Sequence, residues 1–185
     1  TKKYQIKSST MNNLDKKIGI DIFSGAGGLS LGAEMAGISV QYAIEIDSDA
    51  AKTYKKNHPK AEVICKDIRM INPTDLTEGN HPVFIIIGGP PCQGFSMSNT
   101  ISRNMENPKN FLFKEFVRFV KKLKPIWFVL ENVKVLLTLS GGSFRDDIHL
   151  RFESLGYTVT HKLLNAADYG IPQNNGIPVT GLIEH

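Results

Sequence analysis

The chain has 185 residues, of which 41% are hydrophobic, and its formal net charge is +4. These values predict one globular domain that is long enough to bury a core. No apolar segment reaches the roughly 18 residues that span a bilayer, and residues 1–17 lack the apolar middle of a signal peptide. We therefore expect no membrane contact and a cytoplasmic location.

Charge and cysteine content argue against disulfide-rich and zinc-binding proteins, but they do not indicate a function. The mild basic excess contains no long Lys/Arg run, so it permits a polyanionic partner but equally fits a solvated surface. The two cysteines, Cys65 and Cys92, lie too far from each other and from paired histidines to suggest a disulfide framework or a zinc site. We expect no metal, and a reduced, reactive thiol is left open.

Strand and helix patterns alternate along the chain after a polar, flexible arm over residues 1–17. Because several strand patterns are apolar throughout, they predict a mostly parallel sheet covered by helices on both faces, which is the doubly wound α/β class. The expected strands lie within 18–23, 40–46, 62–68, 83–89, 126–133 and 157–164, and the expected helices over 29–36, 48–57, 111–123 and 144–155.

The segment "DIFSGAGGLSLGAE" places three glycines between the first strand and the first helix. Glu45 ends the second strand about twenty residues later, where a carboxylate can accept hydrogen bonds from a ribose. Together they predict a nucleoside pocket, although glycines alone also fit a plain structural turn. The dinucleotide fingerprint has a third glycine where this chain has Ser30, and the loop offers no lysine for phosphate, so neither NAD nor ATP fits well. Asp67, after the third strand, is a candidate for binding an adenine amino group or for capping a turn.

The stretch "GGPPCQGFS" brings Cys92 to the carboxyl edge of the same sheet. A buried, inert cysteine would lie inside a strand or helix, as Cys65 does in the predicted pattern, whereas a rigid Pro/Gly loop favours a nucleophile. Glu131 and Asn132 follow the apolar fifth strand at that edge. A carboxyl group desolvated there would have a raised pKa and could donate a proton, although capping a following helix is the alternative.

These segments resemble motifs of one family, the cytosine-C5 DNA methyltransferases, which use S-adenosylmethionine. Six of the family's motifs are matched in order between Ile18 and Gln173: "DIFSGAGG", "AIEIDSDA", "KDI", "GGPPCQGFS", "ENVKVLL" and "NAADYGIPQN". The resemblance implies the Rossmann-like fold of S-adenosylmethionine-dependent methyltransferases. It also implies that residues 18–174 form the catalytic and cofactor-binding domain.

The resemblance also implies roles for individual residues. Cys92 would attack C6 of a flipped-out cytosine, protonated Glu131 would hydrogen-bond N3, and Asn132 would hold the loop. The cofactor pocket would be lined by Phe23, Ser24, Gly25, Ala26, Gly27, Gly28, Leu29, Glu45, Ile46, Asp67, Ile68, Pro91 and Leu112. Candidate contacts to DNA are Gln93, Ser96, Ser98, Arg103, Lys109 and Gln173. For Ser96, Ser98, Arg103 and Lys109 a solvated loop is the alternative.

The chain departs from the family pattern after Gln173. The family continues with Gln-x-Arg-x-Arg and a further strand, but Asn175 and Ile177 stand at the arginine positions, and the final strand is expected to be missing. No target recognition domain is visible. Residues 175–185 resemble the family's terminal motif, in which Asn175 would touch the cofactor. Three explanations fit this departure from the family pattern. A stretch was lost near residues 173–175, or a second polypeptide carries the recognition domain, or the chain is an inactive truncated product.

The expected function is therefore transfer of a methyl group from S-adenosylmethionine to C5 of cytosine in double-stranded DNA, within a bacterial restriction-modification system near the nucleoid. A tRNA methyltransferase of the same family is the first alternative. An inactive cofactor-binding fragment or subunit is the second. A dehydrogenase is disfavoured by Ser30 and by the cysteine and glutamate at the pocket.

Overall fold

The computed structural model describes residues 17–77, 82–91, 111–132, 143–171 and 176–180. Within them the strands form one sheet in the order β3-β2-β1-β4-β5-β7-β6. The strands are β1 (Ile18–Ile22), β2 (Ser39–Glu45), β3 (Glu62–Cys65), β4 (Ile85–Gly88), β5 (Trp127–Glu131), β6 (His161–Asn165) and β7 (Gly176–Thr180). The helices are α1 (Gly28–Met35), α2 (Ser48–Asn57), α3 (Phe111–Leu123) and α5 (Ser143–Glu153), with short 3-10 helices η1 (Ile68–Met70), η2 (Pro73–Leu76) and η7 (Ala166–Tyr169).

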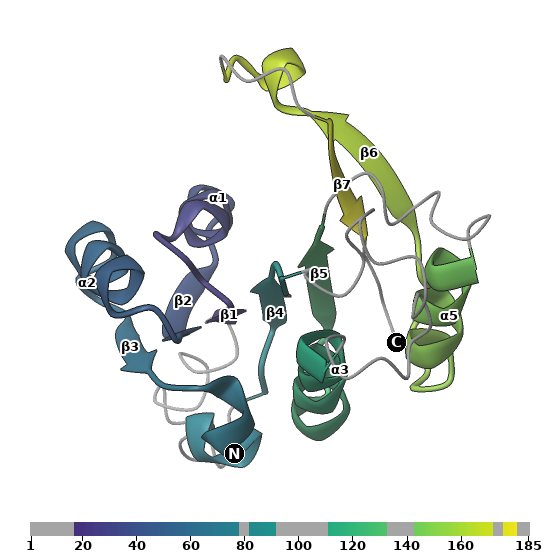
Figure 1. Cartoon of the computed structure of the whole chain (residues 1–185), viewed down its shortest axis with the longest axis horizontal. Helices are drawn as coiled ribbons and strands as arrows, with labels where there is room; N and C mark the ends of the chain where they lie inside the picture. The colour runs from purple at the N-terminus through teal and green to yellow at the C-terminus, as the bar shows by residue number, and fades with distance from the viewer. Residues whose placement is uncertain (1–16, 78–81, 92–110, 133–142, 172–175, 181–185) are drawn as a thin grey trace, which may run out of the picture.

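The sheet has the predicted doubly wound architecture. Strands β3, β2, β1, β4 and β5 are all parallel, whereas β7 runs antiparallel to both β5 and β6. The chain reverses its direction of winding between β1 and β4, so the carboxyl ends of these neighbours open a crevice at the sheet edge. Figure 1 shows β6 and β7 together at one side of the sheet, with η7 at their far end.

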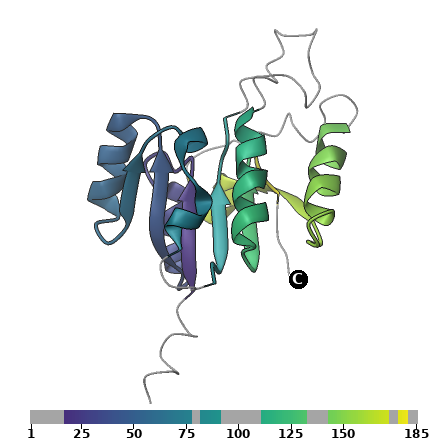
Figure 2. The same ribbon diagram turned by 90° about the horizontal axis from the view of Figure 1, so that it is seen from below.

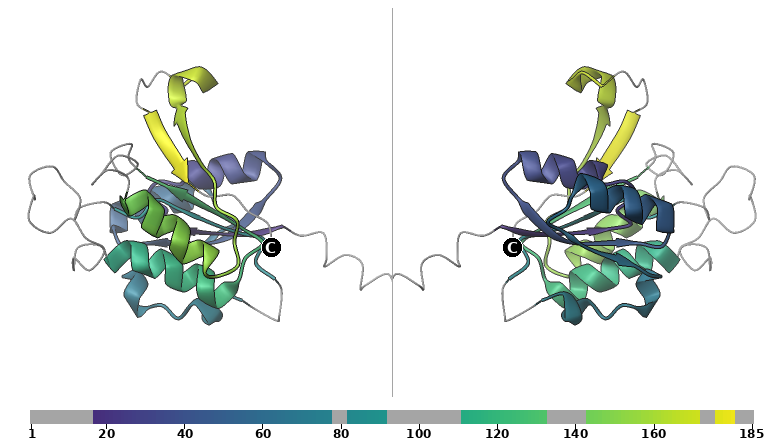
Figure 3. Two further views of the ribbon diagram at one scale, coloured as in Figure 1. Left: turned by 90° about the vertical axis from the view of Figure 1, so that its right-hand side faces the viewer. Right: turned by 90° about the vertical axis from the view of Figure 1, so that its left-hand side faces the viewer.

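The two faces of the sheet are buried by different helices. Figure 3 shows α1 and α2 on one side of the strands and α3 and α5 on the other, and Figure 2 shows α3 beside β4 with α5 beyond it. The larger core lies between the sheet and α3 with α5, where Phe128 stacks on Phe152 at 4.2 Å between ring centroids. Phe116 meets the edges of both rings. Such aromatic contacts contribute about 0.5–1.5 kcal/mol each beyond their buried area.

Local sequence explains where the helices lie. In α3 the fully or nearly buried side chains are Phe113, Phe116, Phe119 and Val120, a spacing of three and four that places them on one face. The side chain of Asp47 caps α2 by accepting the N–H groups of Asp49 and Ala50 at 2.9 and 2.8 Å. Both helices therefore begin and end where the sequence predicted.

Two expectations about the C-terminal part are corrected. The final strand is not missing, because Gly176–Thr180 forms β7 between β5 and β6. Strand β6 begins at His161 rather than at Tyr157, because Tyr157 is buried and its hydroxyl donates to the Pro125 carbonyl at 2.7 Å, which holds that segment outside the sheet ladder. No helix among the described residues is both long and apolar enough to cross a membrane.

Candidate active site

A cavity of about 220 Å³ lies at the carboxyl edge of the central parallel strands. Its walls come from the segments that follow β1, β3 and β4, from the end of β2, and from the first turn of α3. The lining residues are Phe23, Ile44, Glu45, Ile46, Lys66, Asp67, Ile68, Arg69, Gly89, Pro91 and Leu112. Seven of the thirteen described residues that the sequence assigned to a cofactor pocket thus line this cavity; Ile44, Lys66, Arg69 and Gly89 were not anticipated.

Glu45 joins the end of β2 to the glycine loop. One carboxylate oxygen accepts the Gly25 N–H at 2.8 Å, and the other accepts the N–H groups of Ile46 and Asp47 at 2.8 and 2.9 Å. A carboxylate offers about four acceptor positions. The three backbone bonds fix its orientation and leave capacity for one further donor in the cavity.

The loop between β1 and α1 adopts left-handed backbone at three positions. Phe23 has φ 63°, Gly25 has φ 53° and Gly27 has φ 99°. Left-handed backbone costs a non-glycine residue about 1–2 kcal/mol, so the Phe23 conformation is strained and points to a functional constraint. A Cβ atom on Gly27 would also collide with the ring of His58, which is buried and whose Nε2 lies 3.0 Å from the Gly27 carbonyl oxygen.

The remaining predicted loop residues, Ser24, Gly25, Ala26, Gly27, Gly28 and Leu29, are not among those that line the cavity. Ser24 is buried, and Leu29 packs toward the second hydrophobic cluster under α1. Their predicted contact with a cofactor stays a prediction.

A buried polar network beneath this loop was not anticipated. Ser30 Oγ donates to Asp21 Oδ2 at 2.6 Å and lies 2.6 Å from the Tyr54 hydroxyl. Asp21 is fully buried, and burial raises its pKa to about 7, against the opposing effect of the Ser30 hydrogen bond. The only signal in the sequence was one aspartate inside the apolar run "IGIDIF". Ser30, which stands where the dinucleotide fingerprint has a glycine, thus forms hydrogen bonds inside the fold.

Asp67 performs the capping role that was one of its two predicted alternatives. Its carboxylate accepts the Arg69 N–H at 3.0 Å, caps η1, and pairs with the Arg69 guanidinium. The Arg69 side chain, followed by its backbone N–H, lowers the pKa of Asp67 to about 2. Asp67 also lines the cavity, so binding of an adenine amino group stays a prediction.

Glu131 ends β5 beside the segment that leads to the predicted nucleophile. It is half-buried, and burial raises its pKa. A Cβ atom on Gly89 would lie 2.5 Å from Glu131 Oε2, so any side chain at position 89 would require the Glu131 carboxyl group to move. Asn132 is buried next to it. Burial thus favours the protonated form of Glu131 more than water does, and its predicted catalytic role stays a prediction.

Several predicted site residues lie outside the described residues: Cys92, Gln93, Ser96, Ser98, Arg103, Lys109, Gln173 and Asn175. Cys65, expected to be buried and inert, is instead exposed at the end of β3, with its Sγ 3.9 Å from the Ile46 carbonyl oxygen. The expectation was wrong because an apolar strand pattern does not show that this edge of the sheet is left uncovered. Among the described residues, no cluster of three His, Cys, Asp or Glu side chains could hold a metal ion.

The fold is the Rossmann-like fold of the S-adenosylmethionine-dependent methyltransferases. A solved structure described as a prophage-encoded DNA modification methyltransferase from E. coli superposes with a TM-score of 0.76 and 32% identity, over 90% of this chain and 46% of that one. The structure of Spodoptera frugiperda DNMT2 has a TM-score of 0.71 at 20% identity, over 91% of this chain and 50% of the other, and shows the fold alone.

Residues 18–175 match the family model of the C-5 cytosine-specific DNA methylases, and the chain belongs to that family. It is 48% identical to the type II methyltransferase M1.HphI of Haemophilus parahaemolyticus over 157 residues, which are 83% of this chain and 42% of that protein. It is 46% identical to M.DdeI of Desulfomicrobium norvegicum over 158 residues, 84% of this chain and 38% of the relative. The chain thus spans about two fifths of the length of these relatives.

One further relative is covered more completely. The type II methyltransferase M.AquIA of Picosynechococcus is 36% identical over 172 residues, which are 86% of this chain and 68% of that protein. The family resemblance predicted from the six motifs is confirmed by these matches.

Proposed function

We propose that the chain is the cofactor-binding and catalytic part of a cytosine-C5 DNA methyltransferase of the type II restriction-modification kind. The observation that carries the proposal is the position of Glu131, which is half-buried and has a pKa raised by burial. Its carboxyl group lies next to Gly89, and Gly89 precedes Cys92 by three residues in the sequence. Membership of the C-5 cytosine-specific methylase family supports it.

The residues of the cavity fit S-adenosylmethionine. Phe23, Ile46, Ile68 and Leu112 offer apolar walls for an adenine ring, while Glu45 retains one acceptor position that suits a ribose hydroxyl. When bound, the cofactor supplies a methyl group on a sulfonium, which is an electrophile for C5 of cytosine. We propose that the pocket residues predicted from the sequence hold the cofactor in this cavity.

The chain's own groups prepare the base for that reaction. Cytosine C5 is a weak nucleophile until the ring loses its aromaticity, so the Cys92 thiolate forms a bond to C6 while Glu131 donates a hydrogen bond to N3, where negative charge develops. After C5 has gained the methyl group, it loses its proton to solvent. The electron pair of the C5–H bond restores the double bond and releases Cys92 as the thiolate. Because these atoms are buried in duplex DNA, the base must first be flipped out.

Recognition of a DNA target requires more than the described domain. The chain spans about two fifths of the length of M1.HphI and M.DdeI. We propose that the recognition surface is supplied by further polypeptide, either in the same chain or as a second subunit.

Covalent capture tests the proposal. Duplex DNA with 5-fluorocytosine at the target position cannot lose a proton from C5, so the protein with S-adenosylmethionine should form a stable adduct, and Cys92→Ser should form none. Absence of an adduct with the complete protein, including its recognition region, would refute the proposed reaction. An adduct with tRNA but not with duplex DNA would favour the tRNA alternative.

A further inference from the structure

The turn that follows β3 forms part of the cavity wall but has little stability of its own. It consists of η1, three residues long, and both Ile68 and Arg69 line the cavity. Its own backbone bonds run from Met70 N to Asp67 O at 2.9 Å and from Ile71 N to Ile68 O at 3.2 Å. A 3-10 turn of this length has poor hydrogen-bond geometry. Its position must therefore be set by contacts from elsewhere in the fold.

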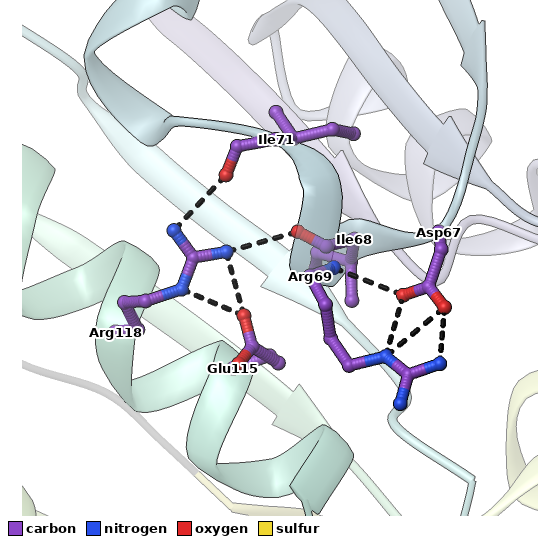
Figure 4. A network of polar contacts seen from close by, with 6 residues as sticks. All are labelled: Asp67, Ile68, Arg69, Ile71, Glu115 and Arg118. Carbon is purple, nitrogen blue, oxygen red and sulfur yellow. Dashed lines mark hydrogen bonds and ion pairs between the residues drawn. The ribbon is translucent and has the colours of Figure 1, made fainter.

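The buried side chains of Ile68 and Ile71 anchor the turn in the main core, and Arg118 on α3 provides its polar contacts. Its guanidinium donates from Nη1 to the Ile71 carbonyl at 3.0 Å and from Nη2 to the Ile68 carbonyl at 2.9 Å, across 47 and 50 residues of sequence. Glu115, one turn earlier on α3, accepts Arg118 Nε at 2.6 Å and so holds the guanidinium in this orientation. Figure 4 shows Arg118 reaching from α3 to the backbone of the turn, while the Asp67–Arg69 pair lies on the other side.

Two walls of the cavity are joined by this arrangement. Leu112, in the first turn of α3, lines the cavity, as do the residues of the turn that Arg118 contacts. We propose that Arg118 is a positioning residue for cofactor binding, which fixes the Asp67–Arg69 turn against α3 so that this wall is formed before the ligand arrives. The inference rests on the proposed function, since it takes the ligand to be S-adenosylmethionine or its product S-adenosylhomocysteine.

Arginine suits this role because its rigid fork can satisfy two carbonyl oxygens at once, whereas a lysine ammonium on a flexible stem cannot reproduce that geometry. Removing the guanidinium leaves the Ile68 and Ile71 carbonyls without these donors and Glu115 without its cation. The turn then samples other positions. Because apparent affinity falls with the fraction of molecules in the binding-competent state, a turn that is correctly placed in about a tenth of the molecules weakens binding about tenfold.

The test compares Arg118→Met and Arg118→Lys with the wild type. Calorimetry should show binding of S-adenosylhomocysteine weakened about tenfold or more by Arg118→Met, with partial recovery in Arg118→Lys. Hydrogen exchange on the ligand-free protein should show faster exchange of the Met70 and Ile71 amides in Arg118→Met, because these bonds close the turn.

Matched variants separate positioning from general loss of stability. Val120→Ala, on the same helix and fully buried, should lower the thermal midpoint but leave the affinity for S-adenosylhomocysteine within about twofold of the wild type. Arg151→Met removes an ion pair with Asp147 on α5 and should leave the thermal midpoint and the affinity for S-adenosylhomocysteine unchanged. Equal weakening by Val120→Ala and Arg118→Met would overturn the inference, as would unchanged affinity in Arg118→Met.

Failure of the inference can be told apart from failure of the proposed function. A wild-type protein that does not bind S-adenosylhomocysteine would refute the proposed cofactor, and the exchange of the Met70 and Ile71 amides would still decide whether Arg118 orders the turn. If Arg118→Met does not fold, Arg118→Lys and Glu115→Gln replace it. Wild-type affinity in both of those variants would overturn the inference.

Discussion

The buried Asp21 should make the stability of this domain depend on pH in an unusual direction. Burial raises the pKa of this carboxyl group from 3.8 to about 7. At about 1.4 kcal/mol for each pH unit, ionisation of Asp21 at high pH costs the folded state about 4 kcal/mol. The substitution Asp21→Asn replaces the carboxyl group by an amide that cannot ionise, and the amide oxygen can still accept the Ser30 hydroxyl.

The direction of this pH dependence follows from whether the folded or the unfolded protein holds the Asp21 proton. Below about pH 4 the carboxyl is protonated in both the folded and the unfolded protein, so ionisation costs nothing. Between pH 3.8 and about 7 only the folded protein keeps the proton, and its stability falls as the pH rises. Above about pH 7 both states are ionised and the full cost is present. Asp21→Asn should therefore exceed the wild type in stability by about 2 kcal/mol at pH 5 and by about 4 kcal/mol at pH 8.

Urea unfolding from pH 5 to pH 8 measures this difference directly, as the change in midpoint multiplied by the slope. The matched control is Asp168→Asn, which removes a carboxyl group that is exposed on η7 instead of a buried one. A gap between Asp21→Asn and the wild type that stays constant within about 0.5 kcal/mol across this range would refute the reasoning, because it would mean that Asp21 is not desolvated in the folded state.

Three further substitutions test the geometry of the site. Gly89→Ala should displace the Glu131 carboxyl, because the added methyl would lie 2.5 Å from Glu131 Oε2, and slow single-turnover methylation about 10–100-fold at saturating S-adenosylmethionine; an unchanged rate would contradict the proposed role of Glu131. Gly27→Ala should lower the free energy of unfolding by about 2–4 kcal/mol because of its positive φ and the collision with His58, and a loss below about 1 kcal/mol in urea unfolding would speak against this packing. Glu45→Gln should weaken S-adenosylhomocysteine binding about tenfold in calorimetry because the amide accepts fewer of the loop N–H bonds; wild-type affinity would show that Glu45 is not needed.

Much of the fold was predictable from local patterns. Apolar runs of strand length alternated with amphipathic stretches, and the limits of α2 and α3 agree with the expected ranges. The position of Glu45 at the end of β2 followed from its distance after the glycine loop. Strand β7 was missed because the run "GIPVT" is short and contains a proline, which weakens any strand pattern, and only its pairing with β5 and β6 defines it.

The sequence by itself determined the order of the elements, the family and the residues that could carry the chemistry, because these depend on local periodicity and on residue types at short spacing. Only the tertiary structure decided which side chains contact one another across the fold. Arg118 bonds carbonyls 47 and 50 residues away, Ser30 meets Asp21 and Tyr54 in the interior, and Gly89 admits Glu131. The reason is physical: local spacing encodes backbone conformation and burial, whereas the choice of a hydrogen-bond partner depends on which distant segments the packed core brings within about 3 Å.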